Sequence, residues 1–381
     1  MTDVRQQRGL NAIKAYVPGK PIDEVRREYG LKDVIKLASN ENSLGPSPKA
    51  LAAIKERLSD LNLYPDVKSH NLLKALAEHL GIRPEQLTVG NGADGLIMQT
   101  CLAYLDEQSE VIVSQSSFPV YDIYTHVMRA VLVKIPLRNF RLDLEAMLRA
   151  ISDKTKLIFV CNPNNPTGTI VTAVEVEAIM DKAPQHVLII YDEAYYEFVD
   201  SPDYPDSLRY IRDGHTNTMI IRTFSKIYGL AGIRLGYAIA EPKILAPLNR
   251  VKEPFSVNLL AQAAGVAALE DQAFLEKTVT TNHAGRIYLY GEFERLRLPY
   301  VRSHTNFILV KIGPQATAVQ EMLLDKGVIV RPCAGYDLPL FLRVTVGSET
   351  QNVRFIEALE PTLAGILGDV SMRRLEPLTK P

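Results

Sequence analysis

The chain has little cysteine and no long apolar run. Its 381 residues include three cysteines, Cys101, Cys161 and Cys333, which lie far apart, whereas a disulfide framework or a zinc site needs paired or clustered spacings. Residues 1–16 lack the apolar core of a signal peptide, and no later run approaches the ~20 apolar residues that span a bilayer. We therefore expect a cytoplasmic protein with reduced thiols and no membrane partner.

The chain also lacks net charge. It carries 43 lysines and arginines against 44 aspartates and glutamates, a formal net charge of -1, so it has no global field to hold a phosphate polymer. Its seven histidines form no metal-ligand spacing such as HExxH, and no GxSxG nucleophile motif occurs. We therefore expect no nucleic-acid partner and no metal ion in the site.

A repeated pattern of short apolar runs and amphipathic stretches begins near residue 86. The runs are QLTVG, VIVSQ, VLVKI, KLIFVC, VLIIYD and TMIIRTF, at residues 86–90, 111–115, 131–135, 156–161, 187–192 and 218–224. Their hydrophobicity is continuous rather than alternating, which indicates strands covered on both faces. Consecutive parallel strands need crossover helices, so the pattern predicts an α/β fold with a mostly parallel sheet between helices.

Length and a change of pattern predict a second, smaller α+β domain. A chain of 381 residues is longer than one hydrophobic core usually organises. After residue 265 a long helical stretch precedes the strand patterns FILVKI, VIVRP and FLRVTV. We expect an N-terminal arm over residues 1–35, a large domain over 36–265, a small C-terminal domain over 266–369 and a tail over 370–381.

Polar residues follow four of the predicted strands, at the sheet edge where ligands bind in open α/β folds. The first segment, GNGADG at residues 90–95, matches the dinucleotide pattern G-x-G-x-x-G, which leaves a nicotinamide-dependent dehydrogenase open. The next strand, however, ends VIVSQSS, without the acid that would bind a ribose. Amides at a helix start suit any phosphate, so this segment predicts a phosphate site under either interpretation.

The other three segments, NPNNPTG, DEAYYE and TFSKIYGLAGIRLGY, contain what a pyridoxal phosphate site needs. Lys226 follows a strand, where its amine could bind an aldehyde cofactor, and Ser225 and Arg234 supply a hydroxyl and a cation for a phosphate. Asp192 ends an apolar run, where a carboxylate needs a cationic partner such as a protonated pyridine nitrogen. A solvated surface lysine and a helix N-cap are the ordinary alternatives for Lys226 and Asp192.

Three further side chains fit the same candidate site. Asn165 and Tyr195 could both hydrogen-bond the phenolic oxygen of the cofactor, and Phe118 could stack on its ring. Each alone has an ordinary explanation, because NPNNPTG is also a turn sequence and isolated aromatic residues usually pack in a core. It is the combination of these residues that favours pyridoxal phosphate.

These segments together resemble the fold-type-I pyridoxal-phosphate-dependent aminotransferases, and within them the branch that acts on histidinol phosphate. The resemblance extends from about residue 16 into the 360s. It is carried by YVPGKP, KLASNENSLGPSP, LYPD, GNGADG, NPNNPTG, DEAYYEF, RTFSKIYGLAGIRLGY, PFSVN, SHTNFILV and VIVRPCAGYDLPLFLRVTVGS. It implies the α/β fold described above and pyridoxal 5'-phosphate as the cofactor.

The resemblance also implies a role for each matching residue. Lys226 would bind the cofactor aldehyde, Asp192 would pair with the pyridine nitrogen, and Tyr195 would hold the phenolic oxygen. The residues implied to bind the cofactor are Ala93, Asp94, Phe118, Asn165, Asp192, Tyr195, Ser225, Lys226, Arg234 and, from the neighbouring subunit of a homodimer, Tyr64. The residues implied to bind the substrate are Tyr16 and Arg343.

The reaction implied by the resemblance is ping-pong transfer of an amino group from histidinol phosphate to the oxo acid 2-oxoglutarate, a step of histidine biosynthesis. The partners would be a small-molecule amino donor and an oxo-acid acceptor. An aromatic amino acid aminotransferase and a threonine-phosphate decarboxylase would use the same scaffold and the same lysine. The dehydrogenase and a non-catalytic ligand sensor are the alternatives from other classes.

Overall fold

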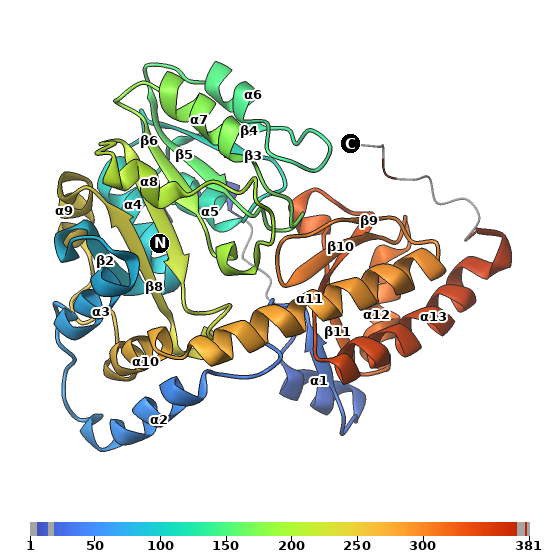
Figure 1. The fold of residues 1–381 in the computed structure, drawn as a ribbon. Coiled ribbons are helices and arrows are strands. Elements are labelled where there is room, and N and C mark those ends of the chain that lie inside the picture. The colour runs from blue at the N-terminus through green and yellow to red at the C-terminus, as the bar shows by residue number, and fades with distance from the viewer. Residues whose placement is uncertain (1–5, 14–18, 372–377, 379–381) are drawn as a thin grey trace, which may run out of the picture.

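The computed structural model describes residues 6–13, 19–371 and 378 and has two lobes, each built around one β-sheet (Figure 1). The long helix α11 (Gln272–Arg295) runs along both lobes. It contacts η4 (Tyr196–Phe198) in the first lobe, and β10 (Phe307–Lys311) and α13 (Glu349–Ser371) in the second. None of the helices in the described ranges is long and apolar enough to cross a bilayer.

The first lobe contains a seven-stranded sheet. Its strands, in spatial order, are β2 (Leu87–Asn91), β8 (Leu235–Ala240), β7 (Thr218–Thr223), β6 (Leu188–Asp192), β5 (Thr155–Cys161), β3 (Glu110–Ser114) and β4 (Val131–Ile135). β7, β6, β5, β3 and β4 are parallel, and β8 is antiparallel to both of its neighbours. The six predicted runs are all strands, which confirms the mostly parallel sheet between helices.

Strand β8 is not among the strands that the sequence predicted. Its second residue is Gly236, and glycine weakens a strand signal. The structure shows why glycine is needed there: a Cβ on Gly236 would lie 2.6 Å from the backbone nitrogen of Ala93. The start of helix α4 (Gly92–Tyr104) is thereby packed closely against β8.

Helices cover both faces of this sheet, as the continuous hydrophobicity predicted. Along β6, Ile189 and Tyr191 face one hydrophobic core and Leu188 and Ile190 face the other. The first core also contains residues of α2 (Pro48–Glu56), α3 (His70–Leu80), α6 (Leu144–Arg149), α7 (Ala173–Lys182), α8 (Ser207–Arg212) and α10 (Leu259–Leu269). The second contains residues of α4, α5 (Val120–Val127) and α9 (Pro242–Val251).

The second lobe contains a five-stranded mixed sheet. Its strands, in spatial order, are β1 (Ile35–Leu37), β11 (Val328–Pro332), β12 (Phe341–Thr345), β10 (Phe307–Lys311) and β9 (Tyr300–Val301). Its core is closed by α11, α12 (Ala316–Asp325) and α13 (Glu349–Ser371), and Val25 of α1 (Ile22–Tyr29) packs beside Leu324 and Ile329. β1 pairs in parallel with β11, so the chain enters this lobe before the large sheet begins. The division into four segments given above stays a prediction.

Candidate functional site

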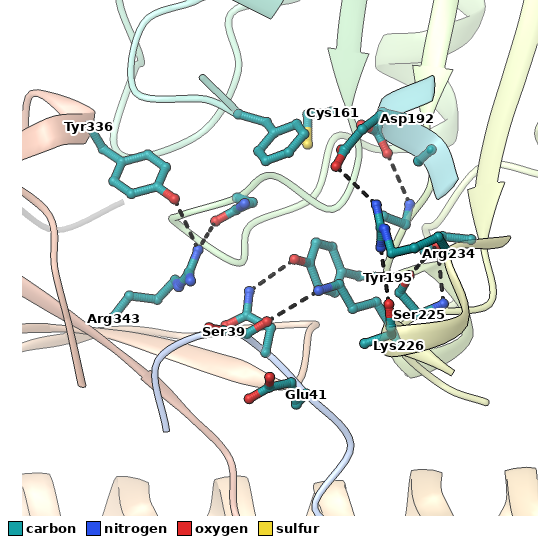
Figure 2. A pocket seen from close by; sticks show the side chains of 18 residues that line it. Ser39, Glu41, Cys161, Asp192, Tyr195, Ser225, Lys226, Arg234, Tyr336 and Arg343 are labelled. Atoms are coloured by element: carbon teal, nitrogen blue, oxygen red, sulfur yellow. Dashed lines mark hydrogen bonds and ion pairs between the residues drawn. The ribbon is translucent and has the colours of Figure 1, made fainter. Parts of the chain in front are cut away.

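A cavity of about 240 Å³ lies where the two lobes meet (Figure 2). It opens at the carboxyl ends of β5, β6 and β7 and at the start of α4, and the second lobe closes it with β12 and η6 (Ala334–Tyr336). The residues that line it are Ser39, Asn40, Glu41, Ala93, Asp94, Phe118, Cys161, Asn165, Asp192, Ala194, Tyr195, Thr223, Ser225, Lys226, Ala231, Arg234, Tyr336 and Arg343.

The structure brings most of the predicted site residues together in this cavity. Those that line it are Ala93, Asp94, Phe118, Asn165, Asp192, Tyr195, Ser225, Lys226, Arg234 and Arg343. Tyr64 does not line the cavity, and 81% of its surface is exposed with its ring stacked on Phe255. Its predicted role at the phosphate stays a prediction because it needs a second subunit. The prediction for Tyr16 falls outside the described residues.

Lys226 presents an amine to this cavity. It lies three residues beyond the end of β7, and its Nζ donates a hydrogen bond to the backbone oxygen of Ser39 at 3.3 Å. Burial, assisted by the nearby Arg343, lowers the pKa of Lys226 from its ordinary value of 10.5 to about 8. A large share of the amine is therefore neutral near pH 8, which is the form that attacks a carbonyl carbon.

Asp192 presents a buried carboxylate to the same cavity. It is the last residue of β6 and only 3% exposed. Burial raises its pKa to about 6, while hydrogen bonds from the Tyr121 hydroxyl at 2.5 Å and the Ala194 amide at 3.2 Å act in the opposite direction. Both donors are neutral, so a cation in the cavity would stabilise the ionised form. A protonated pyridine nitrogen fits that requirement.

An anion-binding corner lies at the start of α4. Arg234 approaches it so closely that a Cβ on Gly92, whose φ is +73°, would lie 2.6 Å from the arginine Nη2. The same guanidinium hydrogen-bonds the Asp94 carboxylate at 3.2 Å, and the hydroxyls of Thr223 and Ser225 are 3.0 Å apart beside it. Free helix-start amides, a guanidinium and hydroxyls form a site that suits a phosphate group.

Arg343 reaches the cavity from β12 in the second lobe. Its side chain is 4% exposed and donates hydrogen bonds to Asn165 Oδ1, to the Tyr336 hydroxyl at 3.3 Å and to the backbone oxygen of Ala38 at 2.7 Å. The planar guanidinium can bind a carboxylate or phosphate through two parallel hydrogen bonds. Because Asn165 Oδ1 accepts from Arg343, the Asn165 amide nitrogen is left to donate elsewhere.

Several residues of this site were not predicted from the sequence, among them Tyr121, Tyr336 and Asn40. Tyr121 donates a hydrogen bond to the Asp192 carboxylate, and Tyr336 accepts one from Arg343. Asn40 donates a hydrogen bond to the Tyr195 hydroxyl at 2.9 Å. A weak signal existed for Tyr121, because it lies three positions after Phe118 at the start of a helix, but no pattern distinguishes it from a core tyrosine.

The site contains no metal-binding group within the part of the chain that the structure describes, where no cluster of three or more histidine, cysteine or acidic residues could hold an ion. The thiols of Cys101, Cys161 and Cys333 are all buried and unbridged. Burial raises the pKa of each thiol to about 12, so these thiols are not nucleophiles at neutral pH.

Comparisons with known proteins give the class of enzyme. A family model described as aminotransferase class I and II matches residues 32–359. The chain therefore belongs to the class I and II aminotransferases, which confirms the predicted enzyme class, a transaminase that depends on pyridoxal phosphate. The alternatives from other classes are not favoured by this result.

Individual relatives match the chain over nearly its whole length. A histidinol-phosphate aminotransferase from Moorella thermoacetica is 50% identical over 353 residues, which cover 93% of this chain and 92% of that protein. One from Caldicellulosiruptor saccharolyticus is 44% identical, and the match covers 93% of this chain and 99% of that protein. The solved structure of histidinol-phosphate aminotransferase from Sinorhizobium meliloti in complex with pyridoxal-5'-phosphate has a TM-score of 0.86 and 27% identity, covering 96% of this chain and 99% of that one.

Proposed function

We propose that this chain transfers an amino group from histidinol phosphate to 2-oxoglutarate, with pyridoxal phosphate bound in the cavity described above. The observation that carries the proposal is the meeting, in one cavity, of a lysine with a lowered pKa, a buried carboxylate and an anion-binding helix start. The choice of amino donor is supported by relatives named histidinol-phosphate aminotransferase, which match over more than 90% of the chain.

The cofactor would be held at three places. Its phosphate would lie at the start of α4 near Arg234 and Ser225, and Asp192 would pair with its pyridine nitrogen at the opposite end. Asn165 and Tyr195 would donate hydrogen bonds to its phenolic oxygen. When bound, pyridoxal phosphate withdraws electrons from the α carbon of the amino donor and makes the proton there acidic.

Lys226 would then serve twice. Its neutral amine would hold the cofactor through the aldehyde, and when free the same nitrogen would move the α proton of the substrate. The guanidinium of Arg343, fixed by Asn165 and Tyr336, would bind the anionic group of each substrate in turn. Phe118, which lines the cavity, would stack on the cofactor ring.

We also propose that the active unit is a homodimer with shared sites. Apolar side chains are exposed in one stretch of sequence, at Leu58 (49%), Leu61 (61%), Leu63 (60%), Tyr64 (81%) and Val67 (52%). Exposed apolar side chains that are covered by a partner are typical of protein interfaces, so we infer that a second copy covers this stretch. Burial of this stretch by a second copy would supply the partner's Tyr64 to the phosphate. The cytoplasmic location belongs to the same proposal and is supported by the unbridged thiols.

The proposal is tested by measuring each half-reaction separately. Cofactor-loaded protein is mixed with histidinol phosphate without an oxo acid, and the absorbance of the bound cofactor is followed. We expect complete conversion at a concentration at least about tenfold lower than phenylalanine requires, since a pocket that pairs a substrate phosphate discriminates strongly against analogues without it. Addition of 2-oxoglutarate should restore the original spectrum and yield glutamate.

Two results would contradict this assignment. Preferred conversion by phenylalanine would make the protein an aromatic amino acid aminotransferase. Release of carbon dioxide from threonine phosphate without any oxo acid would make it a decarboxylase. A matched control is Lys226→Ala, which should retain the fold and show neither half-reaction.

A further inference from the structure

Asn40 lies between the two lobes in a conformation unusual for a side-chain-bearing residue. It follows β1, its φ is +56°, and only 1% of its surface is exposed. Its backbone is held by the second lobe, because its N–H donates to Thr345 Oγ1 at 3.0 Å and its carbonyl oxygen accepts from Asn306 Nδ2 at 3.0 Å. The side chain nevertheless reaches into the cavity and contacts Tyr195, a residue of the first lobe.

The hydrogen bonds around Asn40 determine which way its amide group faces. The Thr345 hydroxyl accepts from the Asn40 backbone and donates its own hydrogen to Asn40 Oδ1 at 3.2 Å. A reversed amide would place an N–H group opposite the Thr345 hydroxyl and would take away Asn40 Oδ1, the acceptor to which this hydroxyl donates. Asn40 Nδ2 therefore faces Tyr195, with the two atoms 2.9 Å apart.

The orientation of this amide also determines what Tyr195 can do. An amide nitrogen only donates, so the Tyr195 oxygen accepts in this contact and keeps its own hydrogen for another partner. The cations that face Tyr195 are Lys226, whose Nζ lies 5.6 Å from the centre of the tyrosine ring, and Arg343. Neither is an acceptor, and Cys161 and Tyr336, the other titratable groups near Tyr195, make no hydrogen bond with its hydroxyl. The hydroxyl hydrogen can therefore be donated to an acceptor in the cavity.

We propose that Asn40 is a positioning residue that makes Tyr195 a hydrogen-bond donor to the phenolic oxygen of the bound cofactor, and that Thr345 fixes Asn40 for this task. The inference rests on the proposed cofactor site. A hydrogen bond donated to the phenolic oxygen spreads its negative charge onto the protein, so this oxygen holds less tightly the proton that it shares with the Lys226 nitrogen. Because Thr345 belongs to β12, the second lobe would influence the acidity of the cofactor through the Asn40 amide.

The test is Asn40→Asp, which keeps the size of the side chain and its tolerance of a positive φ but replaces the donor by an acceptor. An ionised Asp at this position would accept the Tyr195 hydrogen and withdraw it from the cofactor. The readout is the pH midpoint of the absorbance change of the cofactor-loaded protein, together with the cofactor dissociation constant. We expect the midpoint to rise by about one pH unit or more.

Part of such a shift would come from the added negative charge alone, so the measurement needs two controls. The first is Asn40→Asp combined with Tyr195→Phe and compared with Tyr195→Phe alone. In this pair only the effect of the charge remains. The second is Asn42→Asp, which adds the same charge two residues away, where the side chain contacts Ile227 and Thr278 instead of Tyr195. We expect both controls to give a shift smaller by at least about half a pH unit.

An equal shift with and without Tyr195→Phe, or a midpoint unchanged by Asn40→Asp, would overturn the inference. If Asn40→Asp does not fold, Thr345→Val replaces it. This variant removes the hydroxyl that orients the amide, and we expect a smaller upward shift that disappears when Tyr195→Phe is added. A native chain that shows no cofactor band at all would instead refute the proposed function.

Discussion

The lowered pKa of Lys226 predicts how fast the protein captures its cofactor at each pH. With a pKa of about 8, about a tenth of the amine is neutral at pH 7 and about nine tenths at pH 9. A lysine at the ordinary value of 10.5 would be about 300-fold less neutral at pH 7 than this one. Since only the neutral amine attacks an aldehyde, the capture rate should rise about tenfold per pH unit below 8 and then level off.

The assay is rapid mixing of cofactor-free protein with pyridoxal phosphate between pH 6 and 10, with the absorbance change as the signal. Arg343→Gln should move the break in the profile to higher pH, because the guanidinium helps to lower the pKa of Lys226. A rate that still climbs through pH 10 in the native protein would refute the reasoning, since it would show an amine that is fully solvated.

Three further predictions concern Tyr121, Asp192 and the exposed apolar stretch. Tyr121→Phe removes the hydroxyl that donates to Asp192 and should weaken cofactor binding about tenfold, measured by equilibrium dialysis; unchanged affinity would contradict the role given to this bond. Burial raises the pKa of Asp192 from 3.8 to about 6, so the folded cofactor-free protein holds this proton more tightly than the unfolded chain. Its free energy of unfolding should therefore fall as the pH rises from 4 to 6, by up to about 3 kcal/mol. Asp192→Asn should make this fall smaller in urea titrations and leave the part due to Glu197, whose pKa burial raises to about 8; an identical slope in the variant would contradict the assignment. Finally, Leu61→Asp places a charge in the exposed apolar stretch and should convert a dimer into monomers with reduced cofactor affinity; sedimentation showing an intact dimer would contradict the proposed interface.

The fold was predictable from the sequence wherever strands are buried on both faces. VLIIYD and TMIIRTF are continuous apolar runs, and in the structure every residue of β6 and β7 is buried. Strand β8 was missed because its Gly236 serves close packing against α4 rather than strand propensity. The pairing of β1 with β11 joins residues about 290 positions apart, and no local pattern indicates such a pair.

The candidate site was predictable to the extent that its residues follow strands. Lys226 and Asp192 stand directly beyond apolar runs, and parallel strands bring their carboxyl ends to one edge. The residues that hydrogen-bond the predicted site residues were not predictable, as with Asn40 on Tyr195 and Tyr121 on Asp192. Asn40 meets Thr345 across 305 positions and Tyr121 meets Asp192 across 71. The first contact therefore exists only once the second lobe has folded, and the second only once the first lobe has folded.

The most direct test of the central claim is to locate the cofactor on the chain. Cofactor-loaded protein is treated with sodium borohydride, which makes the bond between the amine and the cofactor permanent, and is then digested and analysed by mass spectrometry. The account predicts that the added mass lies on Lys226 and is absent in Lys226→Ala. Added mass on another lysine, or none in a protein that shows the cofactor band, would contradict it.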